Sequence, residues 1–450
     1  IIQMESDDVI IRQFPLRLRP YMVLLGGVCI MLSLPINYSF ANLLPYLVSY
    51  LHYRVDESIT TGSMIWMQTL LSGVPFSMLV GGVLEESIGP RVAVLFGTIL
   101  YTGSIALSSV VIDWSYLWLL VSFGALPAFG NGIAYNAVLI TAQRWFPTNV
   151  GFAGGIIVSG IGCGTFFMAP IQTAFVNPDR YVPNAEGLFP QKDLLDRVPY
   201  VFLVMAAFFT VLQTIGIILL APPSNEPLLD EETPIYDSPN LRLVSRNQLV
   251  LSSSFLFLFL TLFFSSAWVQ IVTGLYKAYA LQFIPSDHFL SMVAAVSSLF
   301  NCASRIVWGY LADKTSYQST MVISSLLGAT VTFCLPFVRY TTNQWLFLSA
   351  ICLIFVCVGG TYSLLPFVSS RLFGKDHFGV LYGLIQISLS FSGICSGLMG
   401  QFLLPLLGYD SLFLLAGLLP VISFIFTALI HLTPLARSCL PSSQELTQDY

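Results

Sequence analysis

Charged side chains are scarce in this chain. Of its 450 residues only 9% are Asp, Glu, Lys or Arg, against roughly 25% in an ordinary soluble domain. Hydrophobic residues make up 56% of the sequence, and the mean hydropathy is +0.79. Because so few charges cannot cover the surface of a soluble protein of this length, soluble fold classes are excluded and an integral membrane protein is predicted.

Residues that build catalytic and metal sites are few as well. Histidine occurs 4 times, and the spacing of the 8 cysteines fits neither a metal site nor a disulfide framework. We interpret the cysteines as buried thiols that pack like small apolar residues. Since the apolar segments hold no nucleophile-base constellation and no cluster of His, Asp or Glu, we expect neither an enzyme nor a bound metal or cofactor. The net charge of −5 indicates no nucleic-acid partner.

What the chain does have is a series of apolar runs long enough to cross a hydrocarbon core of ~30 Å. The pattern predicts an all-α membrane protein with twelve spans near 21–47, 61–84, 91–112, 115–140, 152–175, 199–221, 249–275, 289–311, 319–338, 344–368, 379–405 and 411–431. We therefore divide the chain into an N-terminal tail (1–20), a six-helix half (21–221), a polar linker (222–248), a second six-helix half (249–431) and a C-terminal tail (432–450).

The loops indicate an orientation in the membrane. Lys and Arg are more frequent in the loops on the side of the two termini than on the opposite side, which predicts cytosolic termini. No cleavable signal peptide is expected, because Glu5, Asp7, Asp8 and Arg12 stand where an apolar core would be needed. The plasma membrane is the default location, and the 222–248 linker leaves an internal membrane open. The lipid bilayer is one expected partner. The tails and the linker carry no appended domain, so we expect no obligate protein partner.

Two short patterns each occur twice, 227 positions apart. Gly82-Val83-Leu84 followed by Glu86 returns as Gly309-Tyr310-Leu311 followed by Asp313. With the same offset, a Gly, a Tyr and an Arg of the fourth span return in the tenth: Gly132, Tyr135 and Arg144, then Gly359, Tyr362 and Arg371. One shared offset indicates that the two halves are copies of one architecture. A parallel repeat of six helices is typical of secondary transporters.

The repeated segment from Gly82 to Arg91 resembles the cytosolic loop signature of the major facilitator superfamily. The resemblance implies that the acid of each copy caps or pairs with a neighbouring helix end and holds the cytosolic side shut until the halves rock. The resemblance implies that this acid is Glu86 in the first half and Asp313 in the second half. We accordingly expect a group of gating residues at this side: Glu86, Arg91, Arg144, Asp313 and Arg371.

A second segment narrows the resemblance. Arg144-Trp145-Phe146-Pro147, followed by a glycine-rich fifth span from Gly151 to Gly164, is similar to the oxalate/formate antiporter and monocarboxylate porter branch of that superfamily. The glycines themselves indicate close helix packing and not a substrate. The resemblance implies a small organic substrate, monocarboxylate-like and anionic.

Arg305 is the principal candidate for binding that anion. It lies inside a predicted span, where a charge is costly, and Asn301 lies four residues earlier on the same helix face. In monocarboxylate porters an arginine at this position binds the substrate carboxylate, and a guanidinium fork suits that role. Two alternatives stay open on the sequence: Arg305 could serve the cytosolic gate near Asp313, or its side chain could extend to the cytosolic membrane edge.

Other polar residues of the spans could complete a cavity. Lys277, at the outer end of the seventh span, could attract an anion. Tyr38 and Asn42 share a face of the first span, and repeat mates Tyr135 and Tyr362 could face each other. The full set of substrate-binding candidates is Arg305, Lys277, Tyr38, Asn42, Asn131, Tyr135, Asn301, Tyr362 and Gln386.

The sequence also departs from these relatives. Gln386 lies in an eleventh span without the lysine that oxalate-transporting relatives have, and Asn301 stands where proton-coupled porters have an aspartate. Because the predicted spans contain no Asp or Glu, uniport or exchange is favoured over proton symport. A carrier of a neutral solute such as an amino acid, sugar or nucleoside, and a solute sensor that does not transport, remain alternatives.

Overall fold

The computed structural model describes residues 8–59, 64–181, 184, 188–224, 246–280, 282–284, 287–341 and 343–439. In this part of the chain twelve helical segments are long and apolar enough to cross a membrane, and no strand is present. The predicted all-α, twelve-span architecture is confirmed. Parts of the predicted tails and most of the predicted linker, residues 225–245, lie outside the described residues.

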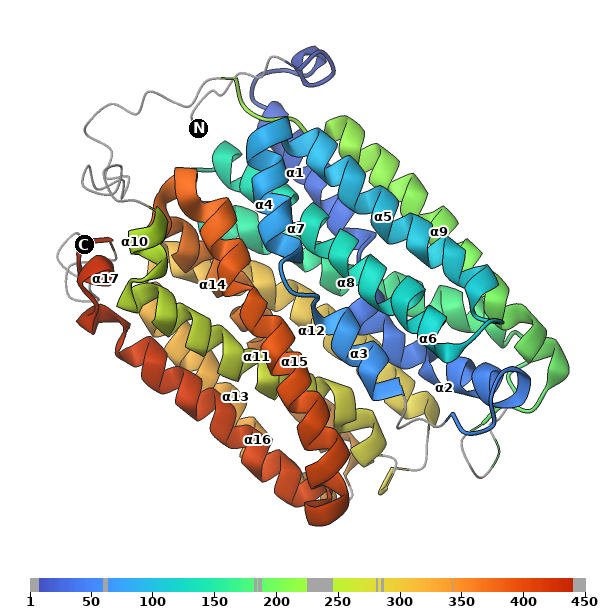
Figure 1. The fold of residues 1–450 in the computed structure, drawn as a ribbon. Helices are drawn as coiled ribbons and strands as arrows, with labels where there is room; N and C mark the ends of the chain where they lie inside the picture. The colour runs from blue at the N-terminus through green and yellow to red at the C-terminus, as the bar shows by residue number, and fades with distance from the viewer. Residues whose placement is uncertain are drawn as a thin grey trace.

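The helices form two groups that lie side by side (Figure 1). The first half consists of α1 (Arg19–Leu32), α2 (Ile36–Arg54), α3 (Ile65–Ser72), α4 (Ser77–Ile88), α5 (Pro90–Val111), α6 (Tyr116–Leu119), α7 (Leu126–Trp145), α8 (Val150–Val176) and α9 (Lys192–Leu219). The second half consists of α10 (Arg246–Val250), α11 (Ser253–Ala280), α12 (Asp287–Lys314), α13 (Tyr317–Thr341), α14 (Gln344–Ile385), α15 (Ile387–Leu398), α16 (Leu404–Ala428) and α17 (Pro434–Cys439).

Helix labels and membrane spans do not coincide everywhere. The tenth and eleventh spans are Gln344–Gly374 and His377–Leu403, so α14 includes the turn between them. Gly374 makes that turn with a φ of 69°, a backbone conformation that favours glycine.

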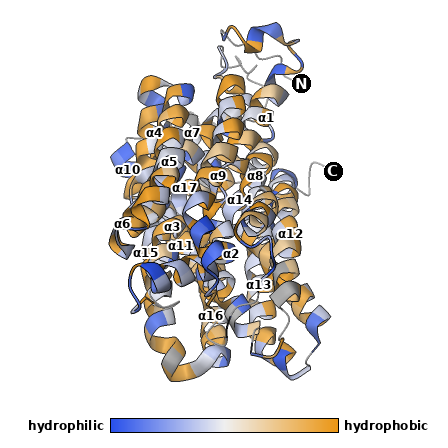
Figure 2. Cartoon of the chain, turned by 90° about the vertical axis from the view of Figure 1, so that its right-hand side faces the viewer, coloured by the Kyte–Doolittle hydropathy of each residue, from blue (hydrophilic) through white to orange (hydrophobic). Residues whose placement is uncertain are grey.

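We call the end of the bundle where α1 begins and α4 ends the terminus side, and the opposite end the distal side. The last described helix, α17, also lies toward the terminus side in Figure 1. Apolar residues dominate the helices between the two ends, whereas hydrophilic residues gather near the helix ends and loops (Figure 2). Large apolar side chains such as Leu117 and Phe337 are 69% and 66% exposed, as expected for surfaces that contact lipid.

The predicted second and sixth spans differ from the observed helices. The span predicted at 61–84 is broken between Ser72 and Ser77, because Gly73-Val74-Pro75 disfavours helix and Phe76 has a φ of 67°. The same span continues to Ile88, so that a membrane-length helix does contain acids, Glu85 and Glu86. At the distal side, α9 begins at Lys192, which the sequence placed in a loop.

Candidate functional site

A large cavity separates the two halves and opens at the distal side. Its volume is about 1630 Å³, and its wall includes distal loop residues such as Asp56 and Arg180. Five of the predicted binding residues line it: Tyr38, Asn42, Lys277, Asn301 and Tyr362. Since helices of both halves contribute, this distal cavity lies at the position between repeats where transporters hold their substrates.

A smaller pocket of about 80 Å³ lies beside the distal cavity, at the break between α3 and α4. Irregular backbone at membrane depth is tolerated where it lines a cavity, and residues 71–74 and 76–78 all line this inner pocket. Tyr38 and Tyr362 line both spaces. The predicted residues that complete the inner pocket are Asn131, Tyr135, Arg305 and Gln386.

Arg305 is held by partners from both halves. Its side chain is 1% exposed. Within α12, Nε donates to Asn301 Oδ1 at 3.0 Å. Across the interface, Nη1 donates to the Val158 carbonyl oxygen at 2.9 Å and Nη2 to the Tyr38 hydroxyl at 3.0 Å. The guanidinium carbon also lies 5.7 Å from the ring centroids of Tyr38 and Tyr362.

The partners of Arg305 are all neutral. Among the described residues no carboxylate lies within 4.0 Å of its nitrogens, and its bonds to Val158 and Tyr38 hold it between the halves. In this structure Arg305 therefore neither pairs with Asp313 nor extends to the membrane edge, and two of its contacts join the two halves. This leaves a buried positive charge at a cavity between two repeats.

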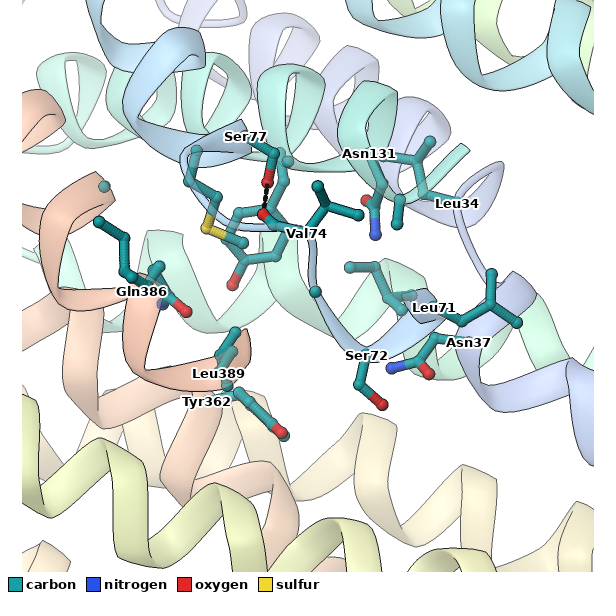
Figure 3. A pocket seen from close by; sticks show the side chains of 18 of the residues that line it. Leu34, Asn37, Leu71, Ser72, Val74, Ser77, Asn131, Tyr362, Gln386 and Leu389 are labelled. Atoms are coloured by element: carbon teal, nitrogen blue, oxygen red, sulfur yellow. Dashed lines mark hydrogen bonds between the residues drawn. The ribbon is translucent and has the colours of Figure 1, made fainter. Parts of the chain in front are cut away.

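Two amide oxygens of the inner pocket lack a hydrogen-bond partner. Asn131 Oδ1 and Gln386 Oε1 are buried and unbonded among the described residues. Figure 3 shows these side chains approaching from opposite sides, Asn131 from α7 and Gln386 from the junction of α14 and α15. Because buried polar groups are normally satisfied, these amides mark the inner pocket as a place for water or a polar ligand.

Asn42 has a different surrounding. Its amide nitrogen donates to the Ala169 carbonyl oxygen at 3.1 Å and to the Thr173 hydroxyl at 3.0 Å. These bonds join α2 to α8 within the first half. Although Asn42 lines the distal cavity, its nitrogen is committed to helix packing.

Charged groups line the mouth of the distal cavity. Lys277 and Arg180 come from different halves, and Asp56 is the acid beside them in the lining. The hydroxyl and backbone N–H of Ser58 hold the pKa of Asp56 below its usual value. The mouth therefore carries both signs of charge, and the cationic character expected at Lys277 is partly offset.

On the terminus side the halves are in close contact along α8 and α12. Asp313 accepts bonds from the backbone N–H groups of Gly151 at 3.0 Å and Phe152 at 2.7 Å, and so caps the N-terminus of α8. Arg371 lies 3.9 Å from the same carboxylate. Gly309 permits this approach, because a Cβ there would lie 2.2 Å from the Gly151 carbonyl oxygen.

A second pair, α4 and α14, closes the same side. A Cβ on Gly82 would lie 2.5 Å from the Gly379 carbonyl oxygen. That oxygen accepts a bond of 2.9 Å from the amide of Asn136, which also donates to the Met78 carbonyl oxygen at 2.7 Å. Asn136 thus joins the halves.

The two neighbouring acids of the first half, Glu85 and Glu86, have different partners. Glu85, not Glu86, forms the buried pair with Arg144, at 2.6 and 3.2 Å. Glu86 is half-exposed and binds Arg246 at 2.5 Å across the two halves. Consecutive residues on a helix point about 100° apart, so the α4 surface that meets α7 presents Glu85 and leaves Glu86 at the rim.

Arg91 does not bridge the halves. It donates to the carbonyl oxygens of Ile217 at 3.0 Å and Ile218 at 2.9 Å, and pairs with Asp8 at 2.5 Å. All three partners belong to the first half or its tail. Arg91 therefore satisfies the C-terminal carbonyls of α9, which differs from the gating position expected from the sequence.

Replacing Glu85 with glutamine should destabilise the protein more than replacing Glu86. The Glu85 side chain is 1% exposed, and its loss of charge leaves Arg144 without its bidentate partner, which should lower the free energy of unfolding by about 2 kcal/mol. The exposed Glu86 pair should contribute less than about 1 kcal/mol. Thermal unfolding of both variants in detergent measures the difference, and equal melting temperatures would contradict the assignment of the buried acid.

Cavities between two similar halves, closed on one side and open on the other, are the arrangement expected of a membrane transporter. The family model described as Major Facilitator Superfamily matches residues 24–394 and 258–447, and the chain belongs to that superfamily. The membership predicted from the loop signature is confirmed, and the protein is a multi-pass membrane transporter of a small-molecule substrate.

Particular relatives agree with this assignment. The chain is 25% identical over 491 residues to apicoplast pyruvate carrier 1 of Toxoplasma gondii, covering 93% of this chain and 88% of the relative. It is 22% identical over 350 residues to the oxalate:formate antiporter of Oxalobacter formigenes, covering 76% of each. The fold matches that of FucP, a Major Facilitator Superfamily transporter solved in the outward conformation, with a TM-score of 0.65 at 16% identity, covering 91% of this chain and 98% of that chain.

Proposed function

We propose that this transporter moves a small monocarboxylate-like anion by alternating access, and that Arg305 binds its carboxylate. The observation that carries the proposal is a buried guanidinium without a carboxylate partner among the described residues, beside a cavity. An isolated buried charge is costly. A substrate anion would supply the missing counter-charge. Its carboxylate would replace the Tyr38 hydroxyl as the acceptor of the Nη2 hydrogen bond.

The inner pocket sets the size of the bound group. A volume of about 80 Å³ has room for several water-sized groups, which suits the head of a short acid and not a sugar ring with its hydroxyl shell. The aromatic rings of Tyr38 and Tyr362 flank the guanidinium and restrict its orientation. Short 2-oxo acids and formate, the kinds of substrate named for the relatives, are therefore the first compounds to test.

The proposed cycle follows from the two closed helix pairs. With the terminus side shut by Asp313 on α8 and by Gly379 against Gly82, the anion enters from the distal side. The halves then rock about the bound carboxylate, the glycine contacts part, and the site opens toward the termini, which we place in the cytosol. Because no carboxylate faces Arg305 among the described residues, we favour uniport or exchange over proton symport.

Counterflow in liposomes tests the proposal. Purified protein is reconstituted with unlabelled pyruvate inside and radiolabelled pyruvate outside, with glucose and alanine as neutral competitors. Accumulation of label that formate or lactate reduces, and that the neutral solutes leave unchanged, is the expected result. Binding of a neutral solute with no response to any carboxylate would overturn the anion assignment and favour the neutral-solute carrier.

A further inference from the structure

Two cysteines from different halves lie in contact where α8 and α12 cross. The Sγ atoms of Cys163 and Cys302 are 2.7 Å apart, and both thiols are unpaired by disulfides. Neither sulfur takes part in the proposed anion site. From sequence, both were interpreted as inert packing residues, because nothing in their spacing brings together positions so far apart in the chain.

The backbones around the thiols are close and in fixed register. Gly162 precedes Cys163, and a Cβ built on Gly162 would lie 3.3 Å from the Cys302 Cα. One turn earlier on α12, Ser298 donates to the Gly162 carbonyl oxygen at 2.8 Å. A disulfide needs a short separation of the two backbones and a sulfur–sulfur bond of about 2.05 Å. The contact between the two sulfurs and the approach of the Gly162 backbone to Cys302 supply that proximity.

The thiols are also reachable. Both cysteines are partly exposed, and the neighbouring apolar residues in the same helices, Phe167 and Leu299, are 48% and 41% exposed. In a membrane-spanning segment such apolar exposure faces lipid. An oxidant that dissolves in the bilayer therefore has access to the pair.

We propose that Cys163 and Cys302 form an oxidative modification site that a lipid-soluble organic hydroperoxide converts into a disulfide between the halves. One thiolate attacks the peroxide oxygen, the O–O bond breaks, and sulfenic acid and an alcohol form. The second thiol then attacks the sulfenic sulfur and releases water. In total two thiols lose two protons and two electrons, and the hydroperoxide becomes an alcohol and water.

The disulfide would hold the transporter in one state. The pair of helices that it joins also carries the closing contacts of the terminus side, the cap of Asp313 on Gly151 and Phe152. A covalent bond within the same crossing opposes the separation that opening requires. Oxidation would thus stop the cycle with the distal cavity open, a regulation that does not depend on which substrate is carried.

Peptide mapping of the oxidised protein tests the modification. Full-length protein in phosphatidylcholine liposomes is treated with cumene hydroperoxide, free thiols are alkylated, and the digest is analysed by mass spectrometry. A linked peptide containing Cys163 and Cys302, absent after dithiothreitol and absent in Cys302→Ser, is the expected result. Cys395→Ser, a partly exposed cysteine of α15, is the matched control and should keep the link. Alkylation of both thiols, or their separate oxidation without a link, would overturn the proposal.

Hydrogen exchange tests the lock independently of transport. The amides of Gly151 and Phe152, which donate to Asp313, should exchange more slowly in oxidised protein and recover after reduction. In Cys163→Ser, peroxide should change neither rate. Unaltered exchange in wild-type protein whose disulfide has been verified would contradict the locking effect, and it would do so whether or not pyruvate is a substrate.

Discussion

Arg305→Gln is expected to lower the affinity for pyruvate by about 100-fold, or about 3 kcal/mol. The substitution removes the positive charge and the bidentate donor geometry of the guanidinium. The glutamine amide can still donate to one neutral partner, the Asn301 oxygen or the Val158 carbonyl oxygen. Arg305→Lys should recover part of the affinity, because it restores the charge without bidentate geometry. Isothermal titration of the purified variants with pyruvate measures both effects.

Two controls separate binding from folding in this experiment. Arg339→Gln removes an arginine of the same half that pairs with Asp410 at 3.0 Å on the distal side, and it should leave the pyruvate affinity within about threefold of wild type. Melting temperatures of all variants show whether each protein is intact. If a well-folded Arg305→Gln protein bound pyruvate with wild-type affinity, Arg305 would not be the carboxylate site.

Gly309→Ala is expected to open the terminus side. The new Cβ would lie 2.2 Å from the Gly151 carbonyl oxygen, a backbone atom that cannot rotate away, so α8 and α12 must separate. Overpacking costs typically about 1–3 kcal/mol, which corresponds to a shift of roughly 5- to 150-fold away from the closed state. Distances between spectroscopic labels at Ile88 and Lys314, exposed ends of α4 and α12 in different halves, should lengthen.

Gly103→Ala is the matched control for this prediction. Gly103 lies within α5, and no heavy atom would come within 4 Å of a Cβ at that position. The distance distribution should therefore equal that of wild type. Identical distributions in the Gly309 and Gly103 variants would show that the glycine contact does not control closure.

The repeat and the apolar runs sufficed to predict the fold, because membrane spans need a length and a composition that are visible in one dimension. The repeat also identified two residues of the inner pocket. Tyr135 and Tyr362 share a repeat position and both line that pocket. The costs of intramembrane charge made Arg305 stand out, but whether it met an acid, lipid headgroups or a cavity depended on the side chains around it.

Other features could not be read from spacing. A fixed offset selects Glu86 as the mate of Asp313, while the rotation of α4 against α7 turns Glu85 inward. From the sequence, Asn42 shares a polar helix face with Tyr38. In the structure α2 packs on α8, and the amide nitrogen of Asn42 donates to Ala169 and Thr173. Both outcomes are decided by the angular position of neighbouring helices, which a sequence pattern does not specify.

The amino-acid sequence by itself determined that this is a membrane-spanning chain of two similar halves with one costly cation inside a span, since hydropathy, repetition and charge are properties of the residues alone. The tertiary structure decided which groups meet across the halves: Arg305 with Tyr38, Asp313 with the start of α8, and Cys163 with Cys302. Those contacts join residues more than 130 positions apart, and they exist only because glycine-lined helices pack at close range.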